Sequence, residues 1–232
     1  MVIIHTNLGL ENQRVCAEAL KAGFEKHDIT AKITADRDLK GDRWDTHVIQ
    51  GPWYAYHEWV GKPGVLWLNR CFYGCHKTIV SLGWLKPDGS RDFKNKDMQT
   101  GKGELPELKP MKTTKRCAIV FGDYNEDASE MFKHSEREHD SSWFRPHPAS
   151  PNVGPIRRLM CDLSTVFDIG DVAVGNKSTV LVDAAINGLH IDCFDPLHVV
   201  HHTNREQWIK DLSWSQWHLN EIANGDAWNH LC

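Results

Sequence analysis

The chain has 232 residues, of which 25% are charged and 41% hydrophobic, and its net charge is −4. This is the composition of a globular protein, and it excludes a disordered chain and argues against a surface coated for nucleic acid. No apolar run approaches the roughly 20 residues of a membrane span, and the N-terminus lacks the features of a signal peptide. Seven scattered cysteines favour a reducing compartment. We therefore expect a cytoplasmic protein with no membrane partner.

The first half of the sequence alternates strand-like and helix-like patterns. Short apolar or alternating segments are predicted as strands at 2–5, 29–33, 47–50 and 65–68. Apolar residues recur at helical spacing over 15–24. Strands that alternate with helices favour a parallel sheet covered on both faces. The pattern predicts an α/β half over residues 1–93.

The middle of the sequence, residues 94–115, shows no apolar periodicity. It contains several glycines and prolines together with recurring lysines at 94, 96, 102, 109, 112 and 115. A stretch of this length without an element is usually a linker or a functional loop. We expect a basic linker or loop here.

The second half restarts the alternation. Strands are predicted at 117–121, 172–174 and 190–194, and helices at 127–134 and 178–187. The tail has the pattern of two helical stretches broken near Ser213 and Gly225. These patterns predict an α/β half over 116–205, followed by C-terminal helices over 206–232.

Two loops of the second half carry residues suited to anions. After a strand ending at Gly175, the sequence Asn176-Lys177-Ser178-Thr179 opens a helix, whose unpaired N–H groups favour phosphate. Asp183 follows one to one and a half turns later, where a carboxylate can accept hydrogen bonds from ribose hydroxyls. The alternative interpretation is an ordinary core helix that Ser178 or Thr179 caps.

The second of these loops follows the predicted strand that ends at Arg145. Arg145-Pro-His147-Pro places two phosphate-binding side chains where open α/β sheets bind ligands. The alternative interpretation is a stiff loop in which Arg145 pairs with a surface carboxylate.

Taken together, the two motifs resemble the donor-binding half of GT-B glycosyltransferases. Capsule-polysaccharide and related nucleotide-sugar transferases show a similar Arg-x-His-Pro, followed by Ser-Thr-x-x-x-Glu-Ala-x-x-x-Gly, where this chain has Asp183 in place of the usual Glu. The donor-binding half of DNA-base glycosyltransferases is part of the same resemblance. The tail 214–231 resembles the ends of small, mostly phage-encoded proteins of this kind. In the family pattern the Ser-Thr pair contacts the diphosphate and the acid contacts the ribose.

The resemblance implies an architecture and a co-substrate. It implies two Rossmann-like halves facing a cleft, with the C-terminal helices packing across their junction. The donor would be a nucleotide-diphosphate sugar, with UDP-glucose as one candidate, and the fold requires neither a bound cofactor nor a divalent metal. The donor site would use Arg145, His147, Lys177, Ser178, Thr179 and Asp183.

In this family the first half supplies the acceptor site and the catalytic base. A base that works near neutral pH is a histidine or a carboxylate of raised pKa. The candidate bases are His57, His5 and Asp45. The candidate acceptor-binding residues are Trp53, Glu58 and Arg70. Each of these residues also fits an ordinary surface or capping role.

The sequence leaves more than one hypothesis for the acceptor. One hypothesis is a hydroxymethylated pyrimidine, such as 5-hydroxymethylcytosine, in double-stranded phage DNA, with the lysine-rich segment following phosphates. The rivals are a surface glycan acceptor, or a nucleotide-binding protein of this fold without catalysis.

Other chemistries are disfavoured by the sequence. No metal site is expected, because neither cluster of potential ligands (Cys71, Cys75, His76; His198, His201, His202) has a second half at zinc-finger spacing. Neither a phosphate loop nor a nucleophile elbow is present.

Overall fold

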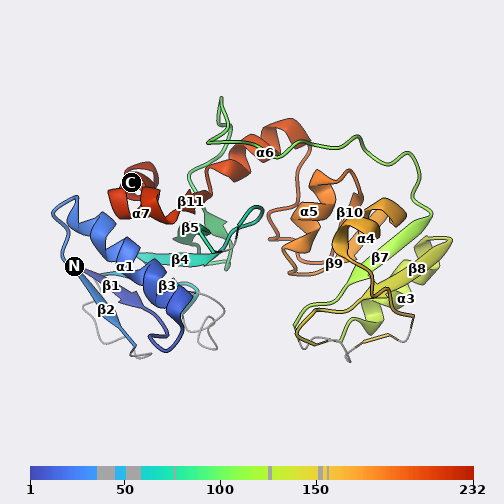
Figure 1. Ribbon diagram of the computed structural model, residues 1–232, viewed down its shortest axis with the longest axis horizontal. Helices are drawn as coiled ribbons and strands as arrows, with labels where there is room; N and C mark the ends of the chain where they lie inside the picture. Colours follow the sequence, from blue (N-terminus) through green and yellow to red (C-terminus); the bar gives the residue numbers. More distant parts are fainter. Residues whose placement is uncertain (36–44, 51–58, 76, 125–126, 151–153, 156) are drawn as a thin grey trace. The chain divides into compact units, whose positions relative to one another are not determined.

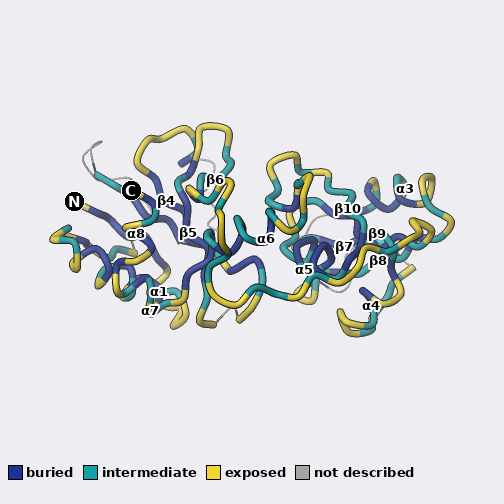
Figure 2. The backbone as a smooth tube through the Cα atoms, turned by 90° about the horizontal axis from the view of Figure 1, so that it is seen from above, coloured by how far each residue is buried: buried dark blue, intermediate teal, exposed yellow. Residues whose placement is uncertain are grey.

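A computed structural model describes the chain except for residues 36–44, 51–58, 76, 125–126, 151–153 and 156. The chain divides into two compact units (Figure 1). Unit 1 comprises Met1–Leu105 and Gln207–Cys232, and unit 2 comprises Pro106–Glu206. In both, buried residues follow the strands and exposed residues follow the loops (Figure 2).

Unit 1 is built on a mixed sheet with the strand order β11-β5-β4-β3-β1-β2, and β6 pairs with β5. The strands that run parallel to one another are β1 (Val2–His5), β2 (Ala31–Thr34), β3 (Thr46–Gln50) and β4 (Val65–Arg70). The strands paired antiparallel are β5 (Ile79–Leu85), β6 (Arg91–Asp92) and β11 (Gln216–His218).

One face of this sheet is covered by α1 (Glu11–Glu25), as Figure 1 shows. Leu20 and Phe24, one turn apart on α1, pack in the same core cluster as the strand residue Ile4. The helices α7 (Leu219–Asn224) and α8 (Asp226–Leu231) add to this cluster. Gly23 allows α1 and α7 to approach closely, because a Cβ at Gly23 would collide with the backbone carbonyl of Ile222.

The opposite face carries a second cluster, made of Ile49, Trp59, Val65, Trp67 and Leu85. Because side chains alternate along a strand, Val65 and Trp67 point to this face while Leu66 and Leu68 point to the α1 face. Both faces are therefore buried, which explains the continuous apolar run in β4.

The tail departs from the sequence prediction. Its breaks near Ser213 and Gly225 are where the prediction put them: α6 (Arg205–Ser213) ends at the first, and Gly225 lies between α7 and α8 with φ 89°. Between these breaks, however, β11 pairs antiparallel with β5. The reason is that a strand buries the Trp217 ring in the unit 1 core while its backbone is satisfied by the edge of the sheet. The tail is therefore part of the unit 1 sheet instead of a purely helical segment.

Unit 2 holds a parallel sheet with the strand order β10-β9-β7-β8. Its strands are β7 (Cys117–Phe121), β8 (Ser141–Arg145), β9 (Val172–Gly175) and β10 (His190–Cys193). The connecting helices are α3 (Ser129–Glu138), α4 (Leu163–Ile169) and α5 (Val180–Ile186). With helices between parallel strands in this unit, and a partly parallel sheet in unit 1, the prediction of an α/β fold is confirmed.

The helices of unit 2 lie on opposite faces of its sheet. Phe132 of α3 packs with Val120 and Val174. Phe167 of α4 faces Phe121, the strand residue next to Val120, with ring centroids 6.3 Å apart. Leu181 of α5 lies over Gly175, the residue next to Val174. Since neighbouring strand residues point to opposite faces, α3 covers one face and α4 and α5 cover the other.

The segment 94–115 is held by hydrogen bonds to both units in turn. In unit 1 the Asn95 side chain donates to the carbonyl of Asp211 over 2.7 Å. In unit 2 the Lys112 N–H donates to the carbonyl of Gly188 over 2.8 Å. An extended segment fixed through its backbone needs no apolar periodicity, which explains the pattern in the sequence.

Within the described residues, none of the helices has the length and apolar character that spanning a bilayer requires.

Candidate functional site

The strand order of unit 2 creates a switch point between β7 and β9. The chain leaves β7 toward α3 on one face, and it leaves β9 toward α5 on the other face. The two loops leave the carboxyl edge of the sheet toward opposite faces, and such a switch point is where open α/β sheets bind ligands. The residues on either side are Gly122 to Tyr124 after β7 and Asn176 to Thr179 after β9.

On the β9 side, the Ser178 and Thr179 hydroxyls are half-buried and lack hydrogen-bond partners within the described residues. Thr179 is the N-cap of α5, but its φ of −62° and ψ of −17° are helical and its side chain makes no capping bond. The capped-helix interpretation therefore does not hold. Because α5 has only seven residues, anion binding here would depend on these hydroxyls and the local N–H groups more than on a helix dipole.

The start of α4, also seven residues long, provides a contrast within the same unit. Ser164 and Thr165 both donate side-chain hydrogen bonds to Asp162, over 2.5 and 2.8 Å. Asp162 also accepts the Thr165 N–H over 3.0 Å and is the N-cap of α4. Of these two Ser-Thr pairs, only the one at α5 is left without protein partners among the described residues.

Asp183 lies in the first turn of α5 and is half-buried. Burial alone raises the pKa of its carboxyl group from 3.8 to about 6. No side chain or backbone group of the described chain donates to this carboxylate. Hydroxyl donors from a ligand would satisfy it and favour its ionised form.

On the β7 side, the carboxylate of Asp123 accepts a hydrogen bond from the Lys177 backbone N–H over 3.0 Å. This bond joins the two loops across the switch point. Asp123 was not among the site residues predicted from the sequence, although a Gly-Asp pair directly after an apolar strand was a usable signal. The Lys177 side chain is exposed, as a residue that meets a ligand phosphate requires.

The loop after β8 brings Arg145 and His147 to the same edge, and both are half-buried. Arg145 donates to the carbonyl of Leu159 over a long 3.4 Å, and no carboxylate among the described residues pairs with it. His147 Nδ1 accepts the Ala149 N–H over 3.1 Å, so a neutral ring carries its proton on Nε2 as a donor. The His147 ring lies 5.6 Å from that of Tyr124.

Of the first-half candidates, the structure describes His5, Asp45 and Arg70, and it does not gather these three into one site. Three of them, Trp53, His57 and Glu58, lie outside the described residues. His5, at the end of β1, is 2% exposed, with Nε2 3.1 Å from His47 Nδ1. It is therefore a buried histidine at the carboxyl end of β1, and the alternative of an ordinary surface role does not apply to it. Arg70 ends β4 and is exposed.

Asp45 lies at the other edge of the same sheet. It precedes β3 and pairs with the N-terminal ammonium of Met1 over 3.4 Å. Since β1, β3 and β4 run parallel, Asp45 lies at their amino ends, whereas His5 and Arg70 lie at carboxyl ends. The structure therefore does not bring Asp45 together with His5 or Arg70.

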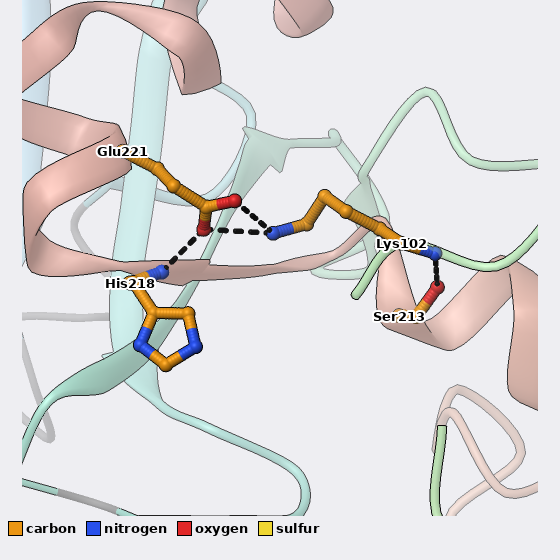
Figure 3. A network of polar contacts seen from close by, with 4 residues as sticks. All are labelled: Lys102, Ser213, His218 and Glu221. Atoms are coloured by element: carbon orange, nitrogen blue, oxygen red, sulfur yellow. Dashed lines mark hydrogen bonds and ion pairs between the residues drawn. The ribbon is translucent and has the colours of Figure 1, made fainter. Parts of the chain in front are cut away.

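Three of the six lysines in the lysine-rich segment, Lys94, Lys102 and Lys112, bind other groups of the protein. Lys102 Nζ contacts both carboxylate oxygens of Glu221 over 3.1 and 2.9 Å (Figure 3). It also lies 4.2 Å from the centre of the Trp217 ring. Only 14% of the Lys102 side chain is exposed. Further pairs join Lys94 to Asp92, Arg116 to Asp140, and Lys112 to the carbonyl of Asp168. These contacts compete with any role of the segment as a phosphate track.

Among the described residues, no three or more His, Cys, Asp or Glu side chains are grouped as a metal ion would require.

Comparisons with known proteins bear on the fold. The sequence matches no protein-family model and no curated protein. Its structure resembles a solved one, the β-Kdo 2,7 transferase KpsC of Thermosulfurimonas dismutans, with a TM-score of 0.53 over 96% of this chain and 97% of that chain. The chain has a glycosyltransferase-like fold. At 13% sequence identity the likeness extends to the fold alone. It agrees with the family resemblance of the sequence, while the facing arrangement of the halves and the phage type stay predictions.

Proposed function

We propose that this protein is a glycosyltransferase that uses a nucleotide-activated sugar and binds this donor in unit 2. The observation that carries the proposal is the set of unpartnered groups beside the switch point: the Ser178 and Thr179 hydroxyls and the Asp183 carboxylate. Because these three groups make no hydrogen bond within the described chain, a polar ligand can bind them without breaking a bond inside the protein. The fold supports the same interpretation, because KpsC is by its name a sugar transferase.

Each group has a role in this proposal. The diphosphate lies against the Ser178 and Thr179 hydroxyls, and the Lys177 ammonium compensates its charge. Asp183 accepts hydrogen bonds from the ribose hydroxyls. Arg145 and the Nε2 donor of His147 stabilise the charge that develops on the diphosphate as the bond to the sugar breaks. The sequence and the structure do not select the donor sugar, and UDP-glucose is the first candidate.

For the acceptor we propose a saccharide in preference to a modified DNA base. The DNA hypothesis relied in part on the basic residues of the segment 94–115, and the contacts of Lys94, Lys102 and Lys112 weaken that support. KpsC, by its name, transfers Kdo. We retain the prediction that unit 1 supplies the acceptor site and a base, with His57 first and His5 second.

The test is a turnover assay with the full chain. It is incubated with a panel of nucleotide sugars, including UDP-glucose and nucleotide-activated Kdo, and free nucleotide is measured. The acceptor arms are saccharides, hydroxymethylcytosine DNA, and none. We expect nucleotide release that a saccharide stimulates; release stimulated only by DNA would reverse the acceptor proposal. Binding of nucleotides without any release would favour the non-catalytic alternative.

A pair of matched double variants tests the donor site. We expect Ser178→Ala/Thr179→Ala to weaken nucleotide binding by about 1–3 kcal/mol, the range for hydrogen bonds to a charged group. Ser164→Ala/Thr165→Ala removes the same side chains from the start of α4 and should leave nucleotide affinity unchanged. Equal affinities of both variants in calorimetric titrations would contradict the assignment.

A further inference from the structure

We infer that Tyr124 stacks on the base of the nucleotide donor, an inference that rests on the proposed function. Tyr124 follows Asp123 in the loop after β7, and it is 59% exposed. It therefore contributes little to the core of unit 2, although it lies beside the switch point. A large exposed ring at this place is suited to covering a planar ligand.

The position of Tyr124 follows from the bond that joins the two loops. Asp123 accepts the Lys177 N–H over 3.0 Å, so Tyr124 and Ser178, which directly follow these two residues, both lie next to the point where the loops are joined. The Ser178 and Thr179 hydroxyls for the diphosphate and the Asp183 carboxylate for the ribose lie on the β9 and α5 side, while Arg145 and His147 follow β8. The base is the remaining part of a nucleotide, and it is the apolar part. On the β7 side, the described loop offers Tyr124 as the aromatic surface for it.

The ring is also held in place from one side. Tyr124 meets the His147 ring edge to face, with centroids 5.6 Å apart and an interplanar angle of 75°. His147 is itself fixed by the Ala149 N–H, which donates to Nδ1. An exposed ring that is already oriented loses less conformational freedom when it stacks on a ligand, and this strengthens binding.

Unit 2 offers a matched control at the same edge. Phe194 follows β10, is 45% exposed, and meets the His134 ring edge to face at 5.2 Å. Its N–H donates to the carbonyl of Gly175 over 2.9 Å. It is thus an aromatic residue of similar exposure, but it lies on the other side of β9 from the switch point.

The experiment compares calorimetric titrations of the full chain and its variants with nucleoside diphosphates and with inorganic pyrophosphate. Base stacking removed by alanine corresponds to a loss of roughly 5- to 100-fold in affinity. We expect that loss for Tyr124→Ala with the nucleotide, and unchanged binding of pyrophosphate. Tyr124→Phe keeps the ring and should keep the wild-type affinity, as should Phe194→Ala.

Each other outcome overturns a distinct claim. Nucleotide affinity unchanged in Tyr124→Ala, or lost in Phe194→Ala instead, contradicts the role of Tyr124 while leaving the donor site in place. An equal loss for nucleotide and pyrophosphate would assign Tyr124 to the phosphate loop and overturn stacking. A wild-type chain that binds no nucleotide would overturn the proposed function itself.

Discussion

Replacing Asp183 with asparagine should make unit 2 more stable and its donor site weaker. Burial raises the pKa of Asp183 from 3.8 to about 6, so the folded chain holds this proton at pH values where the unfolded chain has lost it. The wild-type free energy of unfolding therefore falls as pH rises from about 4 to about 6. The asparagine side chain carries no charge at any pH, so the Asp183→Asn variant lacks this loss.

The size of the effect follows from the pKa difference. At ~1.4 kcal/mol for each pH unit, a rise from 3.8 to about 6 gives about 3 kcal/mol as an upper limit. Asp183 is half-buried, and partial solvation reduces this to about 1.5–3 kcal/mol. We expect Asp183→Asn to unfold like the wild type at pH 4 and to gain this amount at pH 8.

The assay is urea denaturation followed by circular dichroism at both pH values, with nucleotide titrations at pH 8. Asp168→Asn, which removes an exposed carboxylate from α4, serves as the control and should shift neither measurement. We also expect Asp183→Asn to bind nucleotide more weakly, because an amide accepts fewer hydrogen bonds from ribose. A stability difference that is the same at pH 4 and pH 8 would refute the view of Asp183 as a desolvated carboxylate without a partner.

Three further substitutions test the packing and capping described above by chemical denaturation. Lys102→Met should destabilise unit 1 by about 1–3 kcal/mol, because Glu221 then loses its ion-pair partner; a double-mutant cycle with Glu221→Gln should show coupling, and additive effects would contradict it. Asp162→Ala should cost about 1 kcal/mol through loss of the α4 cap, without changing nucleotide affinity; unchanged stability would show that the cap contributes nothing. Gly23→Ala should lower the free energy of unfolding by about 1–3 kcal/mol, since the added Cβ meets the Ile222 carbonyl. An unchanged free energy of unfolding would exclude close packing of α1 on α7.

Local patterns in the sequence were sufficient to predict several elements. The apolar run 117–121 coincides with β7, and the run 172–174 falls within β9 (Val172–Gly175). Both runs consist mainly of residues that favour buried strands and end at a glycine, so neighbouring residues determine them. The strand β11 could not be found in this way. It has three residues, and its partner β5 is far away in the sequence, so only tertiary pairing defines it.

The candidate site, too, could be predicted from local sequence patterns only in part. The motif around Ser178, Thr179 and Asp183 was visible in the sequence, because residue type and spacing carry it. Whether the hydroxyls cap α5 was not visible, since that depends on the backbone angles of Thr179. The bond from Lys177 to Asp123 joins two loops more than 50 residues apart in the chain, and no local pattern indicates it.

The most direct test of the donor site is hydrogen exchange of the full chain, read by mass spectrometry with and without a saturating nucleoside diphosphate. Binding at the switch point predicts slower exchange in residues 176–183 and 122–124, with residues 1–35 unchanged. Protection confined to unit 1, or no protection anywhere in the chain, would contradict the assignment of the donor to unit 2.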